Sequence, residues 1–92
     1  MKTIYKYEFR VDDIDDVNDS SPTFRLPVGA KILNVDSQYP SRICFWAMVD
    51  TDRDLEDVKL LVFGTCIPCT AEFANYIGTV QERGFVWHVF RA

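Results

Sequence analysis

The segment 76–90 is the feature that most limits what this chain can fold into, because it predicts a β-hairpin. It contains three Val, two Phe and one each of Tyr, Ile, Thr and Trp, with Gly84 between its two halves. β-Branched and aromatic residues favour strands, and a short Gly-containing turn between two such segments is typical of a hairpin. We therefore expect a fold built on a β-sheet that includes the last residues of this sequence.

Five further segments have the composition and alternation of strands. They are residues 1–11, 24–26, 31–36, 43–49 and 58–64. Segment 43–49 is the most apolar, and we expect it to be a central strand buried on both faces. The acidic segments 12–21 and 50–57 are expected to be loops. Segment 70–75 fits either one helical turn or the start of a strand.

The predicted fold is all-β, or mainly β with at most one short helix. We expect a small antiparallel sandwich or barrel-like domain of about six strands, with residues 1–92 as a single domain. A chain of this size buries little surface, and small β proteins often cover their sheet edges by oligomerising. A homo-oligomer is therefore expected.

The sequence points to the cytoplasm. No apolar run approaches the roughly 20 residues that span a bilayer, and the first residues lack the apolar stretch of a signal peptide. Three cysteines, an odd number, fit reduced thiols better than a disulfide framework. We expect no contact with a membrane.

The negative charge is concentrated in the two predicted loops. The chain has a net charge of −4, and an acidic surface argues against general nucleic-acid binding but fits a basic partner. The segment 12–19 lacks the Gly and Glu of a calcium-binding EF-hand loop. The candidate partner-binding residues are Asp12, Asp13, Asp15, Asp16, Asp52 and Asp54.

The residues outside these loops carry a net positive charge, which suggests an alternative. Arginine side chains bind phosphate groups, and aromatic side chains stack on bases. A nucleotide second messenger could therefore be held by Arg10, Arg25, Arg42, Arg83 and Arg91.

Cys66 and Cys69 form a C-x-x-C pair, which can bind a metal or form a disulfide. Together with Cys44 and His88 they would complete a Cys₃His zinc set. However, Cys44 and His88 lie in apolar strands, where a buried thiol or a structural His is common. No catalytic or nucleotide-binding motif is present, so we expect neither an enzyme nor a cofactor.

Several segments resemble a family of short, largely uncharacterised proteins of tailed bacteriophages and prophages. The matching segments are 2–7, 26–35, 46–50, 63–65, 76–81 and 86–90, including LPVGAKILNV, WAMVD, FGT and YIGTVQ. The resemblance implies a phage accessory protein and supplies no catalytic residues. In that family the stretch after Phe-Gly-Thr varies and need not contain the cysteine pair.

Small acidic phage accessory proteins without enzyme motifs commonly act by binding. We therefore expect a non-enzymatic inhibitor of a host defence or nucleic-acid-handling machine, such as an anti-CRISPR protein, in the cytoplasm of the infected bacterial host. Its partner would be a host protein or defence complex, without sequence-specific nucleic-acid binding. The alternatives are an oligomeric sponge for a nucleotide second messenger and a structural or regulatory phage component.

Overall fold

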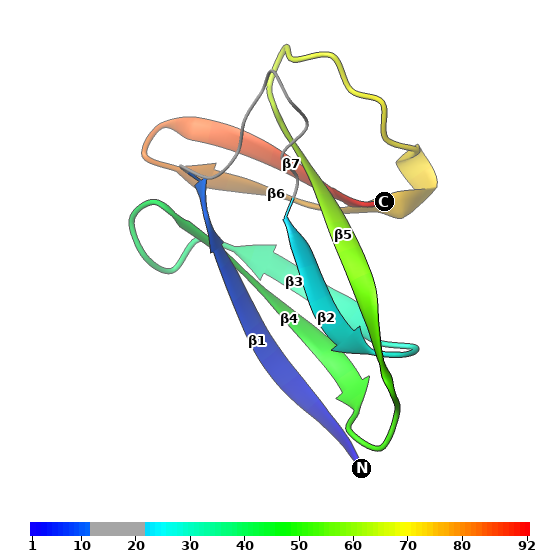
Figure 1. Cartoon of the computed structure of the whole chain (residues 1–92). Coiled ribbons are helices and arrows are strands. Elements are labelled where there is room, and N and C mark those ends of the chain that lie inside the picture. Colours follow the sequence, from blue (N-terminus) through cyan, green and yellow to red (C-terminus); the bar gives the residue numbers. More distant parts are fainter. Residues whose placement is uncertain (12–21) are drawn as a thin grey trace.

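The computed structural model describes residues 1–11 and 22–92, which form an all-β fold of seven strands (Figure 1). The strands are β1 (Lys2–Arg10), β2 (Thr23–Pro27), β3 (Lys31–Asp36), β4 (Arg42–Asp50), β5 (Leu55–Gly64), β6 (Tyr76–Glu82) and β7 (Phe85–Arg91). One 3₁₀ turn, η2 (Phe73–Asn75), precedes β6. The predicted small antiparallel β-fold is confirmed.

The first sheet has three strands in the order β1-β4-β3, and all neighbours are antiparallel. The expectation that β4 is central is confirmed, but burial on both of its faces was wrong. Phe45 and Ala47 are fully buried, whereas Met48 is 42 % exposed. The reason is that successive side chains of a strand point to opposite faces, and only one face of this sheet packs against the second sheet.

The second sheet has four strands in the order β2-β5-β7-β6 and includes the predicted C-terminal hairpin. Its strand β5 begins at Leu55, so the prediction of a loop over the whole of 50–57 was wrong. Glu56 and Asp57 lie within the strand because they pair with β2 in its register. Their charges are offset by Arg91 at 3.7 Å and Arg25 at 3.3 Å, respectively.

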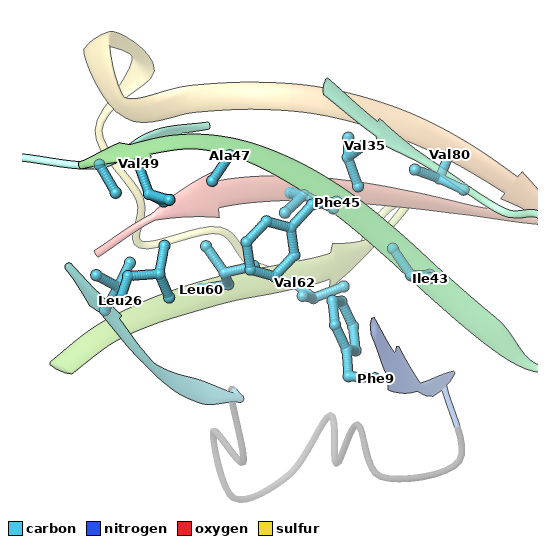
Figure 2. Packing of buried hydrophobic residues seen from close by; sticks show 13 residues of the cluster. Phe9, Leu26, Val35, Ile43, Phe45, Ala47, Val49, Leu60, Val62 and Val80 are labelled. Atoms are coloured by element: carbon cyan, nitrogen blue, oxygen red, sulfur yellow. The ribbon is translucent and has the colours of Figure 1, made fainter. Parts of the chain in front are cut away.

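The core lies between the two sheets. Figure 2 shows Phe45 of β4 directed toward Leu60 and Val62 of β5. Val80 and Val89 of the C-terminal hairpin are also buried in this cluster. The alternating burial of these strands is what a two-layer β-fold requires, since each strand gives one row of side chains to the core.

Aromatic rings fill the space between β1 and β2, which do not pair with each other. Tyr7 stacks on Phe45 at a centroid distance of 5.0 Å, and Phe24 of β2 meets Phe45 edge-on at 4.9 Å. Removal of Tyr7 from water, together with the neighbouring Tyr5, raises the pKa of the Tyr7 hydroxyl. Ring packing therefore holds the two sheets together here without a hydrogen-bonded ladder.

A buried carboxylate links the two sheets near the β3–β4 turn. The side chain of Glu82 at the end of β6 accepts a hydrogen bond of 2.7 Å from the Ser41 backbone N–H. Ser41 has a φ of 65°, which is a left-handed conformation, and Glu82 also lies 3.2 Å from Arg83 Nε. The carboxylate thus accepts a hydrogen bond from a backbone N–H in a turn, where no neighbouring strand supplies an acceptor.

Candidate binding surface

The outer face of the three-stranded sheet carries exposed apolar side chains. Ile4 of β1 lies opposite Met48 of β4, and these residues are 54 % and 42 % exposed. In the adjacent row Lys6 lies opposite the half-buried Trp46. Tyr39 of the β3–β4 turn lies beside Lys6 and is also exposed. We call these five residues, Ile4, Lys6, Tyr39, Trp46 and Met48, the open face.

Lys6 organises the aromatic part of the open face. Its Nζ lies 5.1 Å from the ring centroid of Tyr39 and 5.9 Å from that of Trp46. The same Nζ donates a hydrogen bond of 2.7 Å to the side-chain oxygen of Gln38. A cation held over aromatic faces restricts all the side chains involved. This part of the surface is therefore ordered before any partner binds.

An ion pair bounds the open face toward the other end of β4. Arg42 Nη1 lies 2.6 Å from Glu8 Oε1, and the thiol of Cys44 lies 3.9 Å from the other oxygen of Glu8. Cys44 is fully buried although it points away from the core that contains Phe45. The open face thus combines apolar contact area with a polar rim, as protein-binding surfaces commonly do.

Of the predicted acidic contacts, Asp52 and Asp54 are exposed in the turn between β4 and β5. Asp52 Oδ2 accepts a 2.6 Å hydrogen bond from the Met1 ammonium group, which also lies 3.2 Å from Asp50. These two hydrogen bonds raise the pKa of the Met1 ammonium group. Hydrogen bonds from the Asp52 backbone N–H and from the ammonium group lower the pKa of Asp50.

The other four predicted acidic contacts, Asp12, Asp13, Asp15 and Asp16, lie outside the described residues. Val11 is the last residue described before them, and its backbone N–H donates a hydrogen bond to Ser41 O at one end of β1. Asp52 lies at the opposite end of β1, beside Met1.

The five predicted phosphate-binding arginines are distributed over different elements. Arg10 and Arg42 pair across β1 and β4, Arg25 is on β2, Arg83 is in the β6–β7 turn and Arg91 is on β7. Arg42, Arg25, Arg83 and Arg91 each lie within 4.0 Å of a carboxylate, and Arg10 also has an interaction partner. Within the described part of the chain the five arginines are thus spread over both sheets and one turn and do not converge on one point.

The residues of the possible zinc set lie in two separate places, one at the β5–β6 connection and β7 and the other on β4. Cys66, Cys69 and His88 line one pocket of about 270 Å³, whereas Cys44 is buried on β4. His88 Nε2 lies 2.9 Å from the Thr65 hydroxyl. Its Nδ1 lies 3.2 Å from the Thr79 hydroxyl. Among the described residues no three His, Cys, Asp or Glu side chains are arranged to hold a metal. The four-residue zinc set is therefore not assembled.

Sequence reasoning missed the open face, although part of the signal was visible. Ile4 stands between Lys2 and Lys6 on the polar face of β1, and one apolar residue there is ordinary. It becomes informative only beside Met48 and Trp46, and that proximity depends on the pairing of β1 with β4.

Within residues 1–11 and 22–92, no helix is both long and apolar enough to cross a membrane. Comparison with curated proteins found no match, and comparison with solved structures found none either. The model of one family, a domain of unknown function designated DUF7352, matches residues 1–92. The chain therefore belongs to the DUF7352 family.

Proposed function

We propose that this protein is a non-enzymatic phage accessory protein that inhibits a host defence or nucleic-acid-handling machine by direct binding. The open face is the observation that carries this proposal. Ile4, Met48 and Tyr39 expose apolar surface next to a Trp46 side chain that is already held in place. Aromatic and Met side chains are enriched at the centres of protein interfaces.

The open face suits an inhibitor better than it suits a small-molecule enzyme. Its residues come from two neighbouring strands and the adjacent turn, and they form a surface rather than an enclosed cavity. A rigid β-surface binds with little loss of conformational entropy, because its backbone is already ordered. The partner expected from this chemistry is a protein surface with its own apolar patch.

A phage-plating assay tests the proposal. The protein is expressed in bacterial strains that each carry one defence system, including CRISPR–Cas systems, and phage plating is compared with an empty vector. We expect plating to rise in at least one strain. Met48→Glu should abolish that rise, because a charge at the centre of an interface costs about 2–3 kcal/mol, or about a hundredfold in affinity.

Phe73→Glu is the matched control. Phe73 is 88 % exposed in η2, away from the open face, so the same polar change there should leave inhibition intact. Equal soluble expression and an unchanged far-ultraviolet spectrum establish that the Met48 variant is folded. If no defence system is affected, or if the Phe73 variant fails as completely as the Met48 variant, the proposal is wrong.

A further inference from the structure

A pocket that shares Met48 with the open face is lined by more cations than carboxylates. Its volume is about 330 Å³, and its lining includes Lys2, Lys31 and Arg53. Lys2 of β1 lies opposite Asp50 of β4, and Lys31 of β3 lies opposite Met48 of β4. The two lysines therefore approach from both sides of the central strand, and Arg53 approaches from the turn that follows it.

Among the described residues no ion pair within 4.0 Å involves Lys2, Lys31 or Arg53, although Arg53 is close enough to Asp50 to help lower its pKa. Asp50 is the single acidic residue in the lining, and it already accepts hydrogen bonds from the Met1 ammonium group and the Asp52 backbone N–H. Asp52 is occupied by the same ammonium group, and Asp54 adds one exposed carboxylate to the turn. Arg53 is partly compensated by Asp50, whose pKa it helps to lower, but the lining still holds three cations against one carboxylate, and a bound anion would offset that excess.

The rest of the lining leaves room for a ligand. Gly29 has a φ of 84°, and a Cβ added there would meet no atom within 4 Å. A ligand can therefore come close to the backbone at this turn. Val28 and Met48, which are 39 % and 42 % exposed, provide apolar surface beside the cations.

We propose that this pocket binds the phosphate groups of a small ligand, of the class of nucleoside di- and triphosphates. Ammonium and guanidinium groups form strong charge-assisted hydrogen bonds with phosphate oxygens. The volume of the pocket is at the lower end of the range of about 300–1,000 Å³ for small-molecule sites. A pocket of this size is too small to bind along an extended nucleic-acid strand. Its residues are different from the five arginines that the sequence suggested.

Binding measurements with defined probes test this site. Inorganic pyrophosphate, ATP and a short single-stranded DNA are each titrated into the protein at low salt, followed by calorimetry and backbone NMR. We expect pyrophosphate and ATP to bind and to shift the amide signals of Gly29, Lys31 and Arg53. Lys31→Gln and Arg53→Gln should each weaken binding by about tenfold, the effect of losing one charge-assisted hydrogen bond.

Arg83→Gln is the control because it removes the same charge from the β6–β7 turn, away from the pocket. It should leave the affinity unchanged. The proposal is overturned if pyrophosphate and ATP do not bind, if Arg83→Gln weakens binding as much as Lys31→Gln, or if only the DNA binds. Met48 lines this pocket as well as the open face, so Met48→Glu changes both sites. Lys31→Gln and Arg53→Gln lie outside the open face, and inhibition in the plating assay that survives them separates failure of this proposal from failure of the proposed function.

Discussion

A Cβ built on Gly78 would lie 2.6 Å from Cγ1 of Val35, where β6 of one sheet meets β3 of the other. Only glycine allows the two sheets to approach this closely. Gly78→Ala should therefore destabilise the protein by about 1–3 kcal/mol, the usual cost of adding a methyl group to a packed core. Urea denaturation monitored by tryptophan fluorescence measures the change.

The Gly78→Ala and Val35→Ala double variant is the matched control. Because the truncated Val35 makes room for the new methyl group, the double variant should lose less stability than the sum of the two single variants. Additive losses, or a Gly78→Ala cost within about 0.5 kcal/mol of zero, would show that the contact is not close in solution.

Glu82 should contribute to stability through its hydrogen bond with Ser41. Glu82 is 5 % exposed, and Glu82→Ala would leave the partly buried N–H of Ser41 without an acceptor. We expect a loss of about 1–3 kcal/mol in the free energy of unfolding. Glu82→Gln keeps an acceptor oxygen and should lose less. Equal losses in the two variants would mean that packing, and not the hydrogen bond, is responsible.

The three thiols should differ in reactivity. Cys66 and Cys69 are exposed in the β5–β6 connection, whereas Cys44 is buried beneath the ion pair of Glu8 and Arg42. In a chromogenic disulfide-exchange assay, we expect two thiols to react at once and the third only in denaturant. Cys44→Ser should leave the fast phase unchanged. Three thiols that react at one rate in the native protein would contradict the burial of Cys44.

The acidic residues should speed the approach of a basic partner. Replacing Asp12, Asp13, Asp15, Asp16, Asp52 and Asp54 with Asn should slow association with an inhibited target and make the rate less sensitive to salt. Stopped-flow binding at several salt concentrations measures both effects. If this variant associates and inhibits like the parent at every salt concentration, electrostatic attraction by these residues is excluded.

A variant with only two substitutions distinguishes the effect of charge in the β4–β5 turn from the effect of the net charge of the protein. Asp52→Asn with Asp54→Asn should slow association, whereas Asp36→Asn with Glu72→Gln removes the same charge from exposed positions elsewhere and should not. Equal effects of the two pairs would indicate that only the net charge matters.

Local sequence patterns were sufficient to predict the strands whose ends are set by an adjacent turn. β3 has the predicted limits, Lys31 and Asp36, because a turn containing Gly29 precedes it. The C-terminal hairpin turns at Arg83 and Gly84, which both have positive φ values and so match the right-handed twist of the two strands. In these cases the residues that decide the structure are neighbours in sequence.

Local sequence patterns did not predict the features of the fold that depend on contacts between residues far apart in the sequence. Glu56 and Asp57 suggested a loop, but Arg91 and Arg25 lie beside them on the paired strands β7 and β2. The open face could not be predicted for the same reason. Ile4 and Met48 are far apart in the sequence and become neighbours only through the pairing of β1 with β4. One sequence does not specify that pairing.

Inhibition by binding alone is tested most directly by titrating this protein against a purified defence complex from a strain in which it raises phage plating. If binding alone inhibits, residual activity should fall linearly to a fixed molar ratio and should not change with longer preincubation. Complete inhibition by a small molar fraction of the protein, increasing with preincubation time, would show that it modifies its target catalytically and would contradict inhibition by binding.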